Sequence, residues 1–166
     1  MTKIVVFDSG LGSLSIIQAI QKISKSEIIY FADQQNFPYG KKSQSQLVKI
    51  IQKSITLLEE KFSPDITVVA SNTPSLMLNL ATKKIIDVKP PLKNIQKISK
   101  TKHVGILATN SAIRSKGLTQ YIKQISLPKT FKIFKINESI FYNPSDGIPP
   151  IMGSARIMTL LPYQNM

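Results

Sequence analysis

The sequence predicts an α/β protein with a doubly wound parallel sheet. The first observation is a set of short, unbroken apolar runs, of which residues 4–7 (IVVF) are the clearest. Such runs are typical of strands buried on both faces. The second is that each early run is followed by a segment with apolar residues at helical spacing, a succession that favours parallel strands with right-handed crossovers. The third is an ordinary globular composition, with 42% hydrophobic and 19% charged residues.

Three strand–helix units occupy the first half of the chain. Each apolar run ends in a polar turn, after which apolar residues recur every three or four positions. Pro74 stands in what would be the first turn of a helix, a position that suits proline. The predicted strands lie at 4–7, 28–32 and 66–70, and the predicted helices at 14–23, 43–61 and 74–81.

The second half begins a similar α/β domain and does not complete it. Residues 85–102 are expected to be a connector, because Pro90 and Pro91 interrupt them and Lys-rich polar turns follow. A strand, a helix and a strand are predicted at 101–108, 112–124 and 131–136. We therefore expect a first α/β domain over 1–97, a partial second domain over 98–137 and an irregular tail over 138–166.

The charge balance is strongly basic, with a formal net charge of +13 and a pI near 10.0. Such a balance suits phosphate-rich partners. However, nearly all of the 22 basic residues are lysines spread along the chain, and no helix-turn-helix, RRM, KH or zinc-finger pattern is present. We therefore interpret the lysines as a solvated surface and do not expect nucleic acid as a partner.

Several classes of protein and site are excluded. The sequence has no cysteine, which removes disulfides, thiolate metal sites and cysteine nucleophiles. No apolar run approaches the roughly 20 residues that span a bilayer, so we expect no membrane association. The first strand starts too early for a signal peptide, which makes the cytoplasm the expected location.

The candidate site is the polar turn after the third predicted strand. An apolar run to Ala70 gives way abruptly to Ser71, Asn72 and Thr73, and Pro74 then begins a helix. In open parallel sheets, ligands bind at the carboxyl ends of the strands. The same residues suit a helix N-cap that holds no ligand. The turn by itself leaves both interpretations open.

Three segments taken together extend this pattern. They are residues 7–15 (FDSGLGSLS), residues 30–33 (YFAD) with 38–40 (PYG), and residues 70–73 (ASNT). In this order and spacing they resemble the cofactor-independent glutamate racemases of the aspartate/glutamate racemase superfamily. Residues 105–109 (GILAT) are similar to the next strand of that family. The resemblance covers about residues 3–137, and the tail over 138–166 does not share it.

The resemblance implies a two-domain α/β enzyme that inverts the α-carbon of an acidic amino acid, glutamate or aspartate, without a cofactor or a metal. In such enzymes one base removes the α-proton from one face while an acid delivers a proton to the other. Carried over from the family, Asp8 and Ser9 lie at the first catalytic base and the substrate amine. The other implied substrate-binding residues are Pro38, Tyr39 and Gly40 in a loop over the substrate carboxylates, and Asn72, Thr73 and Thr109 at strand ends.

The sequence departs from the family at both bases, which are cysteines there. Ser71 stands at the first cysteine, and the segment that carries the second is missing. A thiol titrates near pH 8.5, whereas a serine hydroxyl is a far weaker acid and needs a neighbouring base. Asp8 is the candidate for that base, and Ala112 replaces a further family threonine. We therefore expect impaired racemase activity; the alternative is a non-catalytic protein that binds an acidic amino acid or a protein partner.

An incomplete second domain also has consequences for stability. A sheet that stops after two strands leaves edges and apolar faces uncovered. We therefore expect association into a homodimer, and poor order beyond about residue 137.

Overall fold

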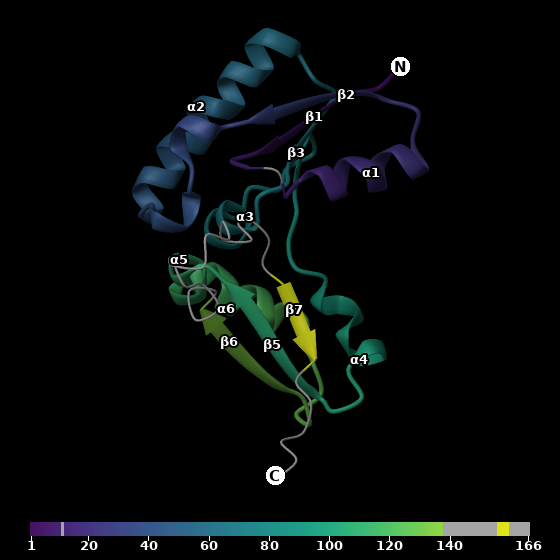
Figure 1. The fold of residues 1–166 in the computed structure, drawn as a ribbon, viewed down its shortest axis with the longest axis vertical. Helices are drawn as coiled ribbons and strands as arrows, with labels where there is room; N and C mark the ends of the chain where they lie inside the picture. Colours follow the sequence, from purple (N-terminus) through teal and green to yellow (C-terminus); the bar gives the residue numbers. More distant parts are fainter. Residues whose placement is uncertain (11, 138–155, 160–166) are drawn as a thin grey trace, which may run out of the picture.

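A computed structural model describes residues 1–10 and 12–137, and the backbone of residues 156–159. These residues form two sheets that lie one beyond the other along the long axis, with helices beside each sheet (Figure 1). The predicted α/β class is confirmed. Poor order was predicted beyond about residue 137. Apart from residues 156–159, that segment lies outside the described residues.

The first sheet consists of β1 (Lys3–Asp8), β2 (Glu27–Ala32), β3 (Ile66–Val69) and β4 (Ile85–Asp87). All its strands are parallel, in the order β2-β1-β3-β4. Phe7 of β1 pairs with Phe31 of β2 on one side and with Val69 of β3 on the other, so β1 is a central strand. The helices α1 (Leu14–Ile23) and α2 (Gln44–Phe62) lie on opposite sides of this sheet, which is the predicted doubly wound arrangement (Figure 1).

Alternate residues of β1 enter two hydrophobic layers. Val5 and Phe7 pack in one cluster with Leu47 of α2. Ile4 and Val6 pack in another cluster, against which the apolar side of α1 lies. Because both faces of the strand are buried, its sequence is apolar throughout instead of alternating.

The long helix α2 has a clear signal at each end. Ser43 and Gln46 form a capping box, in which each side chain accepts a hydrogen bond from the backbone of the other residue. The helix ends at Ser63, whose backbone is left-handed with φ 44°. Between these ends, the buried residues recur at helical spacing at Leu47, Ile51, Ser54 and Leu58.

The second sheet consists of β5 (His103–Ala108), β6 (Lys132–Asn137) and β7 (Arg156–Thr159), in the order β6-β5-β7. β6 is parallel to β5, and β7 is antiparallel to it. The accompanying helices are α4 (Ile95–Ile98), α5 (Asn110–Arg114) and α6 (Lys116–Gln124). In the core of this second unit, Val104 and Ile106 of β5 pack with Leu118 of α6. Leu92 and Ile95 belong to the same core, although the predicted first domain, 1–97, includes them.

The short helix α3 (Asn72–Leu78) connects the two cores. Met77 packs in the cluster beneath α2, whereas Leu76 packs in the core of the second sheet. α6 approaches α3 closely at Gly117, where a Cβ would lie 1.9 Å from the Leu76 carbonyl oxygen. A residue without a side chain is therefore needed at this crossing.

The structure differs from the predicted elements in four places. β4 lies in the predicted connector, and β7 lies in the tail predicted to be irregular. The predicted helix 112–124 is two helices, because Ser115 adopts an extended backbone (ψ 144°) and caps α6. Helix α3 begins at Asn72 instead of Pro74, since Ser71 is the N-cap; Pro74 then occupies the third helical position, whose N–H has no intrahelical partner.

Candidate functional site

Asp8 is the buried carboxylate at the carboxyl end of β1, with 1% of its surface exposed. The N–H of Ser9 donates to its Oδ1 at 2.7 Å. Burial raises the pKa of Asp8, and hydrogen bonds from the backbone of Ser9, Ser13 and Gly10 and from the Ser71 hydroxyl oppose that rise without cancelling it. The carboxylate is therefore a stronger base than an exposed aspartate, and Ser71 is its side-chain partner.

Ser71 lies just beyond the carboxyl end of β3, next to the end of β1. A hydrogen bond from α3 fixes its backbone carbonyl. The hydroxyl of Ser75 donates to the carbonyl of Ser71 at 2.8 Å and lies 3.3 Å from the carbonyl of Val69. The Ser71 hydroxyl makes no capping bond to α3. The N-cap interpretation of this turn thus does not use the Ser71 side chain, whose hydroxyl instead acts to lower the pKa of Asp8.

A row of hydroxyls continues from this pair toward the second sheet. Thr73 Oγ1 lies 3.3 Å from Thr109 Oγ1, which lies 3.3 Å from Ser111 Oγ. Ser111 Oγ donates to the carbonyl of Gly40 at 2.8 Å. Gly40 packs so tightly on Thr109 that a Cβ would lie 2.6 Å from its Cγ2. We call Thr73, Thr109, Ser111 and Gly40 the hydroxyl bridge.

The hydroxyl bridge joins segments that follow strands of both sheets. Thr73 follows β3, Thr109 follows β5, and Gly40 belongs to the short 3₁₀ turn Tyr39–Lys41 in the loop after β2. Thr109 also caps α5, because its Oγ1 accepts from the N–H of Ala112 at 3.3 Å. Polar groups from three strand ends therefore converge at one place, as the carboxyl ends of parallel strands allow.

Tyr39 lies in the loop that was predicted to cover the substrate carboxylates, and its side chain packs in the first core. Its hydroxyl donates to Asp33 Oδ2 at 2.8 Å, and its ring lies edge-on to Phe7 in the first core, with 6.3 Å between centroids. Burial, followed by the Asp33 carboxylate, raises the pKa of Tyr39, so the phenol stays protonated. The Tyr39 side chain thus anchors the loop.

The structure places the remaining predicted residues at the same strand ends. Ser9, Asn72 and Thr73 are buried there, next to Asp8 and Ser71. Sequence reasoning gave no role to Asp33, Ser75 or Ser111. Asp33 had a signal, because it directly follows a strand, whereas the contacts of Ser75 and Ser111 depend on tertiary packing.

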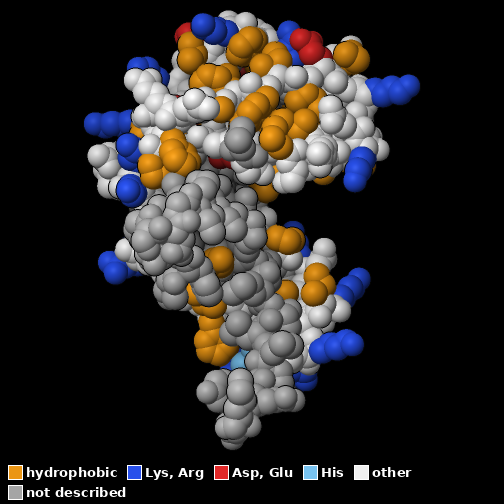
Figure 2. Space-filling model, viewed as in Figure 1, with side chains coloured by type: hydrophobic (Ala, Val, Ile, Leu, Met, Phe, Trp, Pro, Cys, Tyr) orange, Lys and Arg blue, Asp and Glu red, His pale blue; other side chains and the backbone are white. Residues whose placement is uncertain are grey.

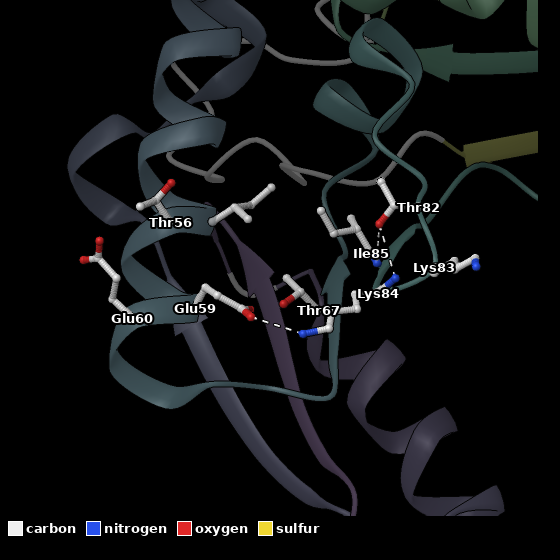
Figure 3. Close-up of a pocket in the computed structure, with 9 residues that line it drawn as sticks. Thr56, Glu59, Glu60, Thr67, Thr82, Lys83, Lys84 and Ile85 are labelled. Carbon is white, nitrogen blue, oxygen red and sulfur yellow. Dashed lines mark hydrogen bonds and ion pairs between the residues drawn. The ribbon is translucent and has the colours of Figure 1, made fainter.

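A separate hollow lies at the other end of the first sheet, between the last turns of α2 and the start of β4 (Figure 3). Its volume is about 580 Å³, and Glu59 and Lys84 form an ion pair at 3.3 Å beside it. Both side chains of this pair are exposed, so it contributes little to stability. The lining residues are Ile55, Thr56, Glu59, Glu60, Thr67, Thr82, Lys83, Lys84 and Ile85, none of which belongs to the predicted site.

The described residues contain neither a cluster of metal-ligating side chains nor a membrane-spanning helix. Among the residues placed by the structure, no three His, Asp or Glu side chains gather as metal ligands would. No helix in the described ranges is long and apolar enough to cross a membrane.

The fold and the strand-end polar groups define an α/β protein with a buried carboxylate–hydroxyl site. No protein-family model matches the chain. The chain is similar to the glutamate racemase of Buchnera aphidicola subsp. Schizaphis graminum, with 36% identity over 139 residues that cover 80% of this chain and 54% of the relative. It is 31% identical to the glutamate racemase of Aliarcobacter butzleri over 98% of this chain and 62% of the relative.

A solved structure shows the same likeness. Glutamate racemase from Francisella tularensis subsp. tularensis, in complex with D-glutamate, superposes with a TM-score of 0.65 at 26% identity, over 82% of this chain and 52% of that one. The predicted resemblance to glutamate racemases is confirmed. The chain spans about half the length of the curated relatives it matches.

Proposed function

We propose that this chain is a glutamate racemase-like protein that binds an acidic amino acid, with glutamate as the first candidate, at the carboxyl ends of β1, β3 and β5. One observation carries the proposal: the Asp8–Ser71 pair and the hydroxyl bridge converge in a chain similar to glutamate racemases. The D-glutamate in the Francisella structure supports the choice of ligand.

Charge and hydrogen-bonding capacity suggest how such a ligand would lie. The ammonium group suits the Asp8 carboxylate, which is the buried negative charge of the site. The ligand carboxylates suit donors, which the hydroxyls of Thr73 and Thr109 and the backbone around Gly40 supply. Asn72 stands beside them at the start of α3.

The proposed reaction needs no cofactor. The Cα–H bond breaks, its electron pair stays on the α-carbon, and the proton passes to an oxygen of the Asp8–Ser71 pair. Return of a proton from the same pair restores the substrate, whereas inversion requires that solvent water deliver a proton to the opposite face. Because Ser71 replaces a thiol with a much weaker acid, we propose that this step is slow.

Deuterium exchange at the α-carbon tests the proposal. L- and D-glutamate, and separately aspartate, are incubated with the full chain in D₂O, and loss of the α-proton signal is followed by proton NMR. We expect exchange of glutamate above the buffer rate, and its loss in Ser71→Ala. Ser99→Ala is the matched control, because Ser99 is a buried serine in the loop after α4, away from the strand ends.

Three outcomes separate the candidates. Exchange that Ser71→Ala abolishes and Ser99→Ala preserves supports the racemase-like function. Binding of glutamate by calorimetry without any exchange points to the non-catalytic alternative. Absence of both, in a protein that circular dichroism shows to be folded, overturns the proposal.

A further inference from the structure

The hollow between the last turns of α2 and the start of β4 is separate from the candidate site (Figure 3). It lies beside the first residues of β3 and β4, whereas the candidate site lies at the carboxyl ends of the strands. Its volume of about 580 Å³ falls within the roughly 300–1,000 Å³ that is typical of pockets for small molecules. The hollow is therefore large enough to hold a small ligand.

Hydrogen bonds fix the wall of the hollow that β3 and β4 form. The N–H of Thr67 donates to the carbonyl of Lys84 at 2.8 Å, which joins the two strands. The turn before β4 is closed in both directions. The N–H of Thr82 donates to the carbonyl of Ile85 at 2.9 Å, and Thr82 Oγ1 accepts from the N–H of Ile85 at 3.0 Å. The opposite wall is the regular helix α2, so the hollow is preformed, as most binding sites for small molecules are.

The floor of the hollow combines two isoleucines with one buried hydroxyl. Ile55 and Ile85 pack against the core cluster that contains Val5. Thr67 lies on the same face of the sheet, because it pairs with Val5 of β1, and it is only 4% exposed. In Figure 3 the Thr67 hydroxyl points toward α2, across the hollow. A ligand here would place an apolar group on the isoleucines and meet a hydroxyl at the base.

The charges around the hollow balance one another. Glu59 and Glu60 of α2 line it together with Lys83 and Lys84, although the whole chain has a net charge of +13. A phosphate-rich ligand would need an excess of positive charge, which this lining lacks. In Figure 3 Glu60 and Lys83 point away from the hollow, so Glu59 and Lys84 are the charged groups beside it. A ligand with one positive and one negative group suits this pair.

The Glu59–Lys84 ion pair can exchange partners at little cost. The distance between Lys84 Nζ and Glu59 Oε1 is 3.3 Å, and both side chains are exposed, so the pair contributes little to stability. A ligand ammonium can replace Lys84 as the partner of Glu59, while a ligand carboxylate replaces Glu59 as the partner of Lys84. Each charge then keeps a partner of the opposite sign.

We propose that this hollow binds the zwitterion of an amino acid with an apolar side chain. Its ammonium group pairs with Glu59, its carboxylate pairs with Lys84, and its side chain covers Ile55 and Ile85. The Thr67 hydroxyl forms a hydrogen bond with the polar end of the ligand. Glutamate fits less well, because its second carboxylate would lie on the isoleucines without a partner. The inference does not depend on the proposed function.

Calorimetry with L-leucine and its two half-molecules tests the need for both charges. Isoamylamine keeps the ammonium group and the hydrocarbon chain of leucine, and isocaproate keeps the carboxylate and the chain. We expect L-leucine to bind at millimolar concentration and each half-molecule to bind about tenfold more weakly, the effect of losing one hydrogen bond to a charged group. Absence of L-leucine binding at millimolar concentration would overturn the inference, and so would equal binding of the three compounds.

Substitutions of the ion pair test where leucine binds. Glu59→Gln and Lys84→Met each remove one charge at an exposed position, so the fold is retained. Each variant is expected to weaken leucine binding about tenfold. Glu27→Gln and Lys53→Met remove the same charges at exposed positions outside the hollow, and they should leave the affinity unchanged. If Glu59→Gln and Lys84→Met bind leucine as tightly as the original chain, the inference is wrong.

Thr67→Val tests the buried hydroxyl. The urea midpoint should stay the same or rise, because valine is apolar and this face of the sheet packs on the first core. Leucine affinity should fall about fivefold, the effect of one hydrogen bond. An unchanged leucine affinity in Thr67→Val would contradict the placement of the ligand over β3.

Discussion

At the scale of single residues, the chemistry of the site depends on the ability of the Asp8 carboxylate to accept a proton from the Ser71 hydroxyl. Asp8 is buried, so its charged form is poorly solvated and its pKa is raised. The raised pKa makes Asp8 a better proton acceptor, and Ser71 is the neighbouring hydroxyl that can give up a proton to it. A serine in this place still starts from a much weaker acid than a thiol.

Replacement of Ser71 by cysteine is therefore expected to increase activity. Ser71→Cys introduces a thiol beside Asp8, and a thiol titrates near pH 8.5. We expect α-proton exchange of glutamate to rise about a hundredfold, within the range of an effective general base, and to increase with pH as the thiolate forms. NMR exchange rates between pH 6 and 9 measure this. A rate equal to that of the original chain would show that Ser71 does not face the α-carbon.

The raised pKa of Asp8 also predicts a pH dependence of stability. A carboxyl group whose pKa is raised on folding holds its proton more tightly in the folded state, so its contribution to stability is greatest at low pH and is lost as pH rises through the folded pKa. Asp8→Asn removes this dependence. The stability of Asp8→Asn relative to the original chain should therefore increase with pH above about 4, the ordinary range of aspartate.

Urea unfolding at a series of pH values tests this dependence. Asp65→Asn is a suitable control, because this carboxylate is exposed, lies away from the candidate site and accepts from the N–H of Lys3 at 2.8 Å. A difference between Asp8→Asn and the original chain that is constant from pH 4 to pH 8 would contradict a raised pKa.

At the scale of elements, the crossing of α3 and α6 fixes how the two cores meet. Gly117→Ala would place a Cβ 1.9 Å from the Leu76 carbonyl oxygen, so a backbone must move. Alanine favours a helix by up to about 1 kcal/mol over glycine, whereas forced overpacking costs about 1–3 kcal/mol. We expect a net loss of stability, seen as a lower urea midpoint. Gln120→Ala, at an exposed position of the same helix, should not lower it.

The elements also show how far the sequence could predict the fold. β1 was clear, because burial on both faces makes its run apolar throughout. β4 could not be predicted from the sequence, because it has only three residues and its pairing with β3 is a tertiary contact. The break at Ser115 was hidden because helical spacing continues across it. Asp8 and Thr73 were named from the resemblance to glutamate racemases, whereas the inward turn of the Tyr39 side chain depends on Asp33 and Phe7.

At the scale of the whole molecule, the distribution of charge agrees with the interpretation of the lysines. Figure 2 shows Lys and Arg side chains scattered around the outline of one face instead of gathered in a patch. A homodimer stays a prediction. Exposed apolar side chains at Ile98 and Phe134, on elements of the second sheet's unit, are consistent with it.

The hydroxyl bridge links the two units, and its central residue should affect stability and ligand binding together. Thr109→Val keeps the shape of the side chain and removes the oxygen that caps α5 and contacts Thr73 and Ser111. Loss of the cap alone costs about 0.5–2 kcal/mol. Because the bridge also positions the Gly40 loop, glutamate affinity should fall about fivefold, the effect of one hydrogen bond.

Ser115→Ala separates these two effects. Ser115 caps the neighbouring helix α6, where its Oγ accepts from the N–H of Leu118 at 3.1 Å, and its hydroxyl donates to the carbonyl of Ala112 instead of to the Gly40 loop. We expect Ser115→Ala to lower the urea midpoint about as much as Thr109→Val and to leave glutamate affinity unchanged. If both variants weaken binding equally, ligand binding responds to the stability of the second unit as a whole. If only Thr109→Val does so, ligand binding depends on the Thr109 hydroxyl itself, which is a proposed donor to the ligand and also contacts Thr73 and Ser111 at the ends of β3 and β5.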